Sequence, residues 1–393
     1  MEKELRPRLD IAIIMRSFWP YYPVLGEALL QCAEKLSYDF NVGVLHGERE
    51  GIHDQLEKQK RGELAKFYSI RTFTDSSSSV IFRIFENISF AFIVLIKLVS
   101  LRPRVIYISS DPPIFLPFIS YLYSKIYKAQ YLYHLHDIHP EAANIILPMN
   151  KPAFYLLQKL DNLSIASASK TIVLSSRMKT VLENRLDKTL DITVLNNPSV
   201  KNTLNKSTTK QNGIVFTGNA GRYQLMPLII GAIEDFYDGG GRLPILFAGG
   251  GVYSDNLISL SEKYHYFSYL GTINPKDAAS LASSYQWALL PIDERVLDYA
   301  FPSKASSYIC MDSTIILICK QNNVLSDWIL SHDLGYVIEP SHFEIIKTFK
   351  MLEEGKLVSK DNSPKREKVK KLLSMDNYVY KLTSLLREIL DRP

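Results

Sequence analysis

Two glycine-rich segments of the sequence have residue types that suit a phosphate-binding site. They are Thr217–Arg222 (TGNAGR) and Ala248–Gly251 (AGGG). Glycine has no Cβ, so a ligand can approach the backbone closely, and Arg222 offers a bidentate contact to phosphate. Taken alone, each segment is equally compatible with an ordinary turn between a strand and a helix. The candidate ligand-binding residues here are Gly218, Asn219, Gly221, Arg222, Gly249, Gly250 and Gly251.

A third segment, Phe301–Lys304 (FPSK), adds a positive charge. Pro302 fits the first turn of a helix, and Ser303 can satisfy free N–H groups there. Lys304 would then oppose the dipole of that helix, an arrangement that is favourable when an anionic ligand binds beside it. The segment therefore predicts an anion site.

The segment Tyr131–Glu141 (YLYHLHDIHPE) contains three histidines and two carboxylates. On a strand, His134 and His136 would share one face, so a zinc pair is geometrically possible. The spacing HxHDxH, however, displaces the aspartate relative to the HxHxDH pattern of metallo-hydrolases. We expect Asp137 and Glu141 to do acid–base or hydroxyl-binding work instead.

The sequence has no D-x-D motif, the pattern that commonly holds a divalent metal on a nucleotide diphosphate. Arg222, Lys304 and helix N-termini would then have to neutralise a leaving diphosphate. This absence predicts a reaction that needs no metal.

Short apolar runs alternate with helical patterns along the chain, which predicts α/β architecture with parallel sheets. The polar segment Ser199–Asn212 interrupts the alternation and is interpreted as a linker. We therefore expect a first domain over residues 1–198, the linker over 199–212 and a second domain over 213–375. The remaining residues, 376–393, are expected to form a C-terminal helix that packs on the first domain.

Composition excludes several classes of protein. The chain has 393 residues, a net charge of +5 and three cysteines without a CxxC pair. A sparse cysteine set suits a reducing compartment, and no secretory signal is recognisable near Met1, so a cytoplasmic protein is expected. The modest charge and the absence of nucleic-acid-binding motifs argue against a nucleic-acid partner.

Residues 80–128 combine large apolar side chains with several basic ones. The most apolar part, Ile88–Leu101, is interrupted by Lys97 and is shorter than the ~20 residues that span a bilayer. Three interpretations remain open: a helix of the α/β core, a helix whose outer face lies in a lipid interface, and a transmembrane span. The basic residues are Arg83, Lys97, Arg102, Arg104, Lys125 and Lys128.

In order and spacing, these motifs resemble the family 4 glycosyltransferases of the GT-B fold. The likeness is strongest to the branch that builds bacterial O-antigen (lipopolysaccharide), capsule and exopolysaccharide, including N-acetylfucosamine transferases. It covers nearly the whole chain and rests on six segments: Phe18–Gly26, Ser109–Pro113 (SSDPP), Asp137–Glu141 (DIHPE), Thr217–Arg222, Gly249–Gly251 and Phe301–Lys304.

The resemblance implies two doubly wound, Rossmann-like domains that face a central cleft. It implies a retaining, metal-independent transferase without a cofactor, which moves a sugar from a nucleotide-sugar donor to a polyprenyl-diphosphate-linked saccharide. The enzyme would associate peripherally with the inner face of the cytoplasmic membrane. Arg222 and Lys304 would stabilise the departing diphosphate, and Asp137 and Glu141 would orient the acceptor or the sugar.

Further site residues follow from the same resemblance. On the donor side it adds Pro302, Ser303, Ser307 and Tyr308. On the acceptor side it places Gly26, Ser110, Pro112, His136 and His139.

The sequence departs from the family at two acidic positions. The family carries two glutamates eight residues apart, and Tyr299 and Ser307 occupy these positions here, with Asp298 one residue away. Two other classes of protein therefore remain open. One is a catalytically inactive GT-B protein that binds a nucleotide sugar or a partner transferase, and the other is a nucleotide-sugar epimerase on the same fold.

Overall fold

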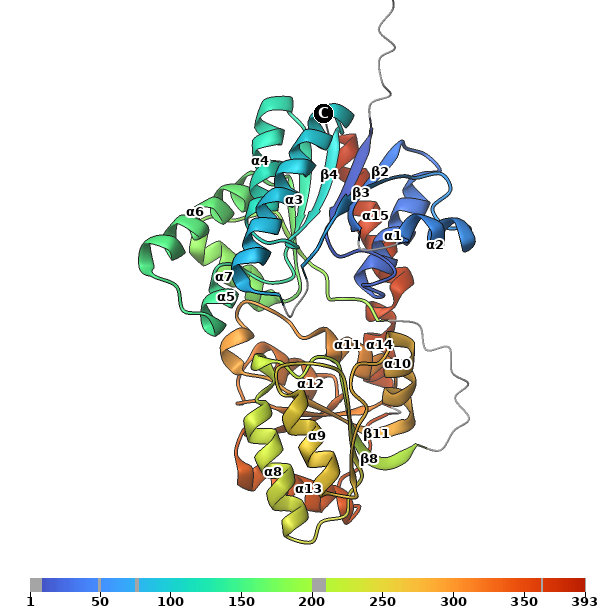
Figure 1. Cartoon of the computed structure of the whole chain (residues 1–393), viewed down its shortest axis with the longest axis vertical. Helices are drawn as coiled ribbons and strands as arrows, with labels where there is room; N and C mark the ends of the chain where they lie inside the picture. The colour runs from blue at the N-terminus through green and yellow to red at the C-terminus, as the bar shows by residue number, and fades with distance from the viewer. Residues whose placement is uncertain (1–8, 49–50, 75–77, 200–209, 362, 393) are drawn as a thin grey trace, which may run out of the picture. The chain divides into compact units, whose positions relative to one another are not determined.

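The computed structural model describes residues 9–48, 51–74, 78–199, 210–361 and 363–392 (Figure 1). The chain forms two compact units. The first comprises Met1–Asn196 and Asp376–Pro393, and the second comprises Asn197–Met375. The charged start of the sequence and most of the predicted linker, 200–209, lie outside the described residues.

The first unit is built on a seven-stranded parallel sheet with the order β3-β2-β1-β4-β5-β6-β7. The central strands β1 and β4 are entirely buried, as expected for apolar strands with helices on both faces. The strands are β1 (Ile11–Met15), β2 (Val42–Glu48), β3 (Lys66–Arg71), β4 (Val105–Ser109), β5 (Gln130–His134), β6 (Lys170–Val173) and β7 (Ile192–Val194).

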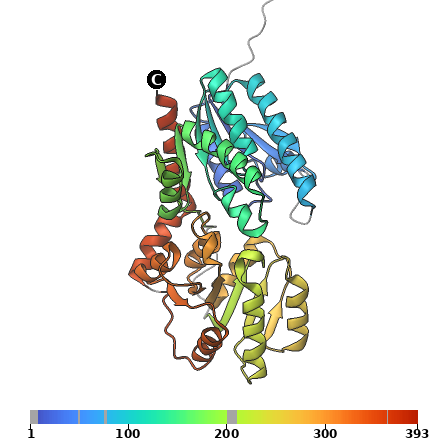
Figure 2. The ribbon, with the colours of Figure 1, turned by 90° about the vertical axis from the view of Figure 1, so that its left-hand side faces the viewer.

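Helices cover both faces of this sheet. On one face α3 packs against α4, and α4 packs against α6; Figure 2 shows α3 (light blue) on the side of the sheet away from α15 (red). The helices are α1 (Leu25–Leu36), α2 (Ile52–Lys58), α3 (Val80–Leu101), α4 (Phe115–Tyr127), α5 (Glu141–Ile146), α6 (Lys151–Ser167), α7 (Ser176–Leu186) and α15 (Met375–Asp391).

The C-terminal helix α15 belongs to the first unit, although the chain reaches it only after the second. Its apolar side chains Val379, Leu382, Leu386 and Ile389 are fully buried. Directly after the helix, Arg392 donates to the carboxylate of Asp191, beside β7, at 3.2 Å. A strongly amphipathic sequence thus completes the core of the unit in which the chain began.

Helix α3 carries an exposed apolar face. By length and composition alone, Ile81–Leu101 is apolar enough to cross a membrane, and 28% of its most apolar window is buried in the protein. Phe82, Phe85 and Phe92 are 70%, 72% and 59% exposed, so they do not fill the core beneath the sheet. Glu86, in contrast, is buried and forms an ion pair with Arg16 just after β1.

The second unit has a six-stranded parallel sheet with the order β10-β9-β8-β11-β12-β13. Its strands are β8 (Gln211–Thr217), β9 (Ile245–Ala248), β10 (Phe267–Tyr269), β11 (Tyr285–Pro291), β12 (Thr314–Ile318) and β13 (Gly335–Ile338). Its helices are α8 (Met226–Asp238), α9 (Ser254–Lys263), α10 (Pro275–Ser284), α11 (Ser303–Cys310), α12 (Val324–Ser331), α13 (His342–Glu353) and α14 (Pro364–Leu373), with short 3₁₀ turns η1 (Arg222–Gln224) and η2 (Glu294–Val296).

In both sheets the strand order reverses direction once, between β1 and β4 and between β8 and β11. Ligands of open α/β sheets bind beyond the carboxyl ends of the strands at such points. The two doubly wound sheets confirm the predicted α/β architecture. One boundary differs, because β8 begins at Gln211, inside the predicted linker.

Candidate functional site

The two glycine-rich loops of the second unit lie against each other at the carboxyl end of its sheet. The N–H of Gly218, after β8, donates to the carbonyl of Ala248 at 2.8 Å, and the N–H of Ala220 donates to that of Gly250 at 2.9 Å. Gly218 and Gly249 have φ angles of 108° and 140°, which other residues rarely adopt. A Cβ atom on Gly249 would lie 2.1 Å from the carbonyl oxygen of Gly218. The sequence therefore needs glycine here to bring the loops together.

Lys304, in the first turn of α11, lies directly on this glycine loop. Its Nζ donates to the carbonyl of Asn219 at 2.9 Å and lies 4.2 Å from the centre of the Phe216 ring. A Cβ atom on Gly218 would come within 2.7 Å of its Cε. Burial lowers the pKa of Lys304 to about 7, and no neighbouring charge contributes to the shift. The site therefore holds a desolvated amine that receives no compensating negative charge from the described residues.

Tyr308 fixes the helix that carries this lysine. Its hydroxyl accepts from the N–H of Thr217 at 2.9 Å and lies 3.4 Å from the Thr217 carbonyl, so α11 is joined to the end of β8. Pro302 precedes α11, Ser303 begins it, and Ser307 lies one turn further along. No side chain from the described residues caps this helix, which leaves its first N–H groups available to a ligand.

Arg222 extends the site toward β11. It is exposed at the start of η1, and the preceding Gly221 donates its N–H to the side chain of Gln224 at 2.9 Å. The N–H of Asp293, after β11, donates to the carbonyl of Tyr223 at 2.8 Å. The predicted donor-side residues therefore gather at the β8–β11 reversal.

Sequence reasoning missed a third loop of this site, which follows β10. Tyr269 donates its hydroxyl to the Gly249 carbonyl at 2.8 Å, and Gly249 donates its N–H to the carbonyl of Gly271 at 2.7 Å. Thr272 lies beside Gly250: a Cβ atom added to Gly250 would be 2.8 Å from Oγ1 of Thr272. The strand β10 has three residues, too few to show the alternating pattern of a strand. The feature of the sequence that could have indicated this loop is the Gly-Thr pair that follows the strand.

In the first unit, the loops after β1, β4 and β5 meet at the carboxyl end of the sheet. The N–H of His136 donates to Oγ of Ser110 at 3.0 Å, and the N–H of Ser17 donates to the carboxylate of Asp111 at 2.9 Å. Pro112 follows in the same loop, and Gly26 packs on the loop after β1, where a Cβ would lie 2.5 Å from the nitrogen of Trp19. The structure thus brings most predicted acceptor-side residues to one edge.

Burial disfavours the charged form of the two histidines at this edge. Burial lowers the pKa of His134 well below its usual value and that of His136 to about 4. The phenol of Tyr107 lies 2.8 Å from Nδ1 of His134, whereas neither ring nitrogen of His136 has a hydrogen-bond partner among the described residues. Within the described part of the chain, no third ligand atom lies close enough to join these two rings around a metal.

Asp137 and Glu141, predicted together, occupy different environments. The carboxylate of Glu141 accepts from Arg185 at 3.1 Å and from Gln158 at 2.7 Å, and Arg185 also donates to buried Asp161 at 2.5 Å. Arg185 additionally donates to the backbone carbonyl of His139 at 3.2 Å, which ties this predicted acceptor-side residue into the same network.

Asp137 has no such ion pair among the described residues, and burial raises its pKa, partly offset by His139. Of the two, Asp137 is therefore the carboxyl group available for chemistry.

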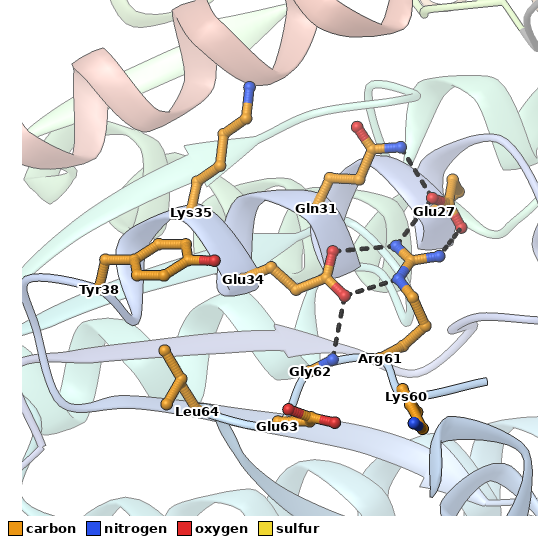
Figure 3. A pocket seen from close by; sticks show the side chains of 10 residues that line it. All are labelled: Glu27, Gln31, Glu34, Lys35, Tyr38, Lys60, Arg61, Gly62, Glu63 and Leu64. Carbon is orange, nitrogen blue, oxygen red and sulfur yellow. Dashed lines mark hydrogen bonds and ion pairs between the residues drawn. The ribbon is translucent and has the colours of Figure 1, made fainter. Parts of the chain in front are cut away.

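A separate pocket of about 700 Å³ lies between α1 and the segment before β3 (Figure 3). Within it, Arg61 donates to the carboxylates of Glu27 and Glu34, at 3.0 and 2.6 Å. With Lys35, Lys60 and Glu63, the lining carries three acidic and three basic side chains, so its formal charges cancel. We therefore assign no ligand to this pocket.

Comparison with known proteins identifies the fold. No protein-family model matches the chain, and no curated protein matches it in sequence. Among solved structures, it resembles sucrose-phosphate synthase from Thermosynechococcus elongatus (TM-score 0.70, 12% identity, 97% of this chain and 99% of the other). It also resembles a glycosyltransferase from Rickettsia africae, with a TM-score of 0.66, 12% identity and coverage of 98% of this chain and 100% of the other. A further likeness is to HepE from Anabaena, solved with UDP, with a TM-score of 0.65, 11% identity and coverage of 97% and 100%. The two parallel sheets and these likenesses establish the GT-B fold.

Proposed function

We propose that this chain with the GT-B fold is a glycosyltransferase whose second unit binds a nucleotide-sugar donor. The observation that carries the proposal is Lys304, a half-buried amine on a glycine loop at the strand-order reversal. Partial desolvation of a cation without a counter-charge is costly, and a diphosphate would supply that charge. The likeness to a structure solved with UDP, and to the same protein solved with UDP and glucose, supports this assignment.

In this proposal the protein, rather than a metal, stabilises the leaving diphosphate. Lys304 contacts the phosphates from the start of α11, and Arg222 contacts them from η1. The absence of D-x-D from the sequence motivates the metal-independent mechanism. The family resemblance further suggests that the configuration of the transferred sugar is retained.

The first unit would bind the acceptor. Asp137 has a raised pKa and no ion pair among the described residues, so we assign it the acid–base or hydroxyl-orienting role. Glu141 is held by Arg185 and Gln158, and we assign it a positioning role beneath the loop after β5.

The acceptor is proposed to be a saccharide on a polyprenyl diphosphate, used in bacterial surface-polysaccharide synthesis. Such a substrate keeps its lipid tail in the bilayer, so the enzyme must reach the inner face of the membrane. The exposed side chains Phe82, Phe85 and Phe92 on α3 support an interfacial helix, with basic residues such as Arg83 nearby. The buried Glu86–Arg16 ion pair ties this helix to the first unit and disfavours a transmembrane span.

The deciding assay offers a panel of nucleotide sugars with a polyprenyl-diphosphate-linked sugar as acceptor, and reads products by mass spectrometry. Transfer of one sugar to the lipid-linked acceptor is expected. Donor binding without turnover would instead identify an inactive nucleotide-sugar-binding protein. Conversion of the donor to another hexose without acceptor would identify an epimerase.

A further inference from the structure

Three side chains that the proposed transfer reaction does not use converge beside the end of β2. His46 and Glu48 lie on the last residues of that strand, and His53 lies in the first turn of α2. The atoms of these three residues that could ligate a metal all lie within 4.8 Å of one another. The cluster is formed entirely within the first unit.

The hydrogen bonds around the cluster leave one buried acceptor atom unused on His46, which is buried, and one on Glu48, which is half-buried. His46 is fully buried, and its Nδ1 lies 3.2 Å from the carbonyl of Gly47. Because a carbonyl can only accept, Nδ1 carries the proton and Nε2 is left with a lone pair. That Nε2 has no hydrogen-bond partner in the described part of the chain. A buried ring nitrogen is seldom left in this state unless another atom fills the space.

Glu48 shows the same division between its two oxygens. Its Oε1 accepts from the N–H of Ile52 at 3.0 Å, which orients the carboxylate, while its buried Oε2 has no partner among the described residues. The remaining member, His53, is exposed and lies on the solvent side of the cluster. Two unused, inward-lying acceptors thus adjoin one solvent-accessible imidazole.

Aromatic packing holds the histidines in place. The ring of Phe18 stacks on that of His46 with centroids 5.2 Å apart and planes 25° apart. Phe67 packs by its edge against both imidazoles, 6.2 Å from His46 and 6.4 Å from His53. Apolar walls around a small set of nitrogen and oxygen ligands are typical of a protein metal site.

We propose that His46, Glu48 and His53 bind a divalent transition-metal ion, with zinc as its best representative. Two imidazoles and one carboxylate form a ligand set that zinc accepts, and a water molecule can occupy the fourth position on the side of His53. The bond from Nδ1 of His46 to Gly47 is the second-sphere contact that metal-bound histidines usually make. Bonds of ~2.0–2.2 Å in tetrahedral geometry place zinc ligands about 3.4 Å apart, so atoms that lie up to 4.8 Å apart would approach one another by up to about 1.4 Å on binding the ion.

The ion would join α2 to the end of β2, next to the loop after β1 that carries Phe18. Its role would therefore be to fix the position of α2 relative to β2 in the first unit. It would take no part in stabilising the diphosphate leaving group. The proposal stands independently of the transferase assignment.

The test uses the full-length protein, stripped of metal and titrated with Zn²⁺ in equilibrium dialysis and with Co²⁺ in visible spectroscopy. We expect one equivalent of either ion to bind, with cobalt bands of low coordination number and no thiolate charge-transfer band. Zinc should also raise the thermal unfolding midpoint, because it binds only the folded site. No binding at micromolar zinc would overturn the proposal and leave the cluster as a hydrated polar pocket.

Variants assign the ligands. His53→Ala removes an exposed ligand and Glu48→Gln keeps the shape of the side chain, so both should fold. Loss of a second-sphere partner lowers metal affinity roughly 10- to 100-fold. Because these variants remove direct ligands, each should lower the affinity for zinc by about a hundredfold or more. The matched control is His265→Ala, which removes an exposed histidine of the second unit. Equal zinc binding by wild type and His53→Ala would contradict the proposed ligand set.

Discussion

The two units differ in whether the charged side chains at the carboxyl ends of their sheets form ion pairs. In the first, two arginines hold carboxylates in ion pairs: Arg185 holds Glu141 and Asp161, and Arg16 holds Glu86, whereas Asp137 has no ion pair among the described residues. In the second, Lys304 lies against a carbonyl oxygen and an aromatic ring and forms no ion pair with any described residue. The backbone of the loop after β8, at Gly218 and Asn219, lies beside its side chain.

This difference separates charges that hold structure from a charge that awaits a ligand. Removing one partner of a buried ion pair lowers the stability of the fold, because the other charge is left buried and uncompensated. A desolvated cation without a counter-charge is itself destabilising, and under the proposed function a bound anion would offset this cost. The comparison predicts that mutations of the paired charges in the first unit lower stability, whereas mutation of Lys304 in the second unit lowers activity.

The largest expected effect is on stability, at Arg185. Arg185→Met leaves the carboxylates of Asp161 and Glu141 buried without their partner, which should cost about 3–5 kcal/mol of unfolding free energy. Denaturant unfolding followed by circular dichroism measures the change. Lys179→Met, on the exposed side of the same helix α7, is the control and should cost less than about 1 kcal/mol. Similar losses in both variants would contradict a structural role of the buried network.

The second effect is on activity, at Lys304. Lys304→Met should lower turnover with the true donor by about a hundredfold, as for loss of one transition-state charge partner. Because the variant removes a desolvated charge, its unfolding free energy should not fall. Lys320→Met removes an exposed lysine that pairs with Glu294 in the same unit and should keep a normal rate. Near-normal turnover by Lys304→Met and by Arg222→Ala would exclude the phosphate assignment.

The third effect is on pH dependence. Since the pKa of Lys304 is lowered to about 7, the free protein loses this positive charge as pH rises through 7. Affinity for a nucleotide sugar should therefore fall above pH 7, by at most about tenfold per pH unit. Stability should move in the opposite direction, because between pH 7 and 10 the unfolded chain binds the proton that the folded one has lost.

Isothermal titration and thermal unfolding across this pH range measure the two slopes. Both slopes should vanish in Lys304→Met. Their persistence in that variant would assign the titration to another group.

A smaller effect is expected at Arg83, a cation of the first unit that is exposed on α3 and forms no ion pair within the described ranges. A basic residue near an anionic membrane contributes roughly 1 kcal/mol, so Arg83→Gln should weaken binding to anionic vesicles about fivefold. Co-sedimentation with vesicles at low salt measures it, and nucleotide binding should be unchanged. The exposed Lys276 in α10 of the second unit provides the control. Equal vesicle binding by wild type and Arg83→Gln would contradict attachment through α3.

The smallest expected effect is that of chelation on the transfer reaction. If Arg222 and Lys304 neutralise the diphosphate, a chelator should leave turnover within about twofold. The measurement is sharpest in His53→Ala, which lacks the proposed zinc site, so that only a metal at the donor site could matter. Full loss of activity in that variant, restored by manganese, would contradict the metal-independent mechanism.

The sequence predicted the two sheets because their central strands are apolar runs with clear boundaries. The apolar run Ile11–Met15 coincides with β1, and the helical pattern of Leu25–Leu36 coincides with α1. Short or polar elements escaped, among them β3, whose residues alternate little in burial, and the three-residue β10. Such segments gain their structure from neighbouring strands, and periodicity does not record this contribution.

The candidate site was predictable only as separate loops. Glycine and lysine types indicated the loops after β8 and β9 and the start of α11. The sequence did not indicate that Glu141 is held by Arg185, 44 residues away, while Asp137 remains without an ion pair. Nor did it associate His46 with His53, because the contact depends on where α2 packs. Long-range pairings of this kind follow from packing rather than from spacing.

The discontinuity of the first unit has a consequence for biosynthesis. Residues 9–196 leave the ribosome before the second unit is made, and α15 emerges only after it. Until then, the surface of α1 that α15 covers, around Cys32, is open to solvent and to chaperones. The nascent first unit must therefore remain unfinished while the whole second unit is translated, and ribosome-bound chains that stop before residue 376 should be far more sensitive to protease than the completed protein.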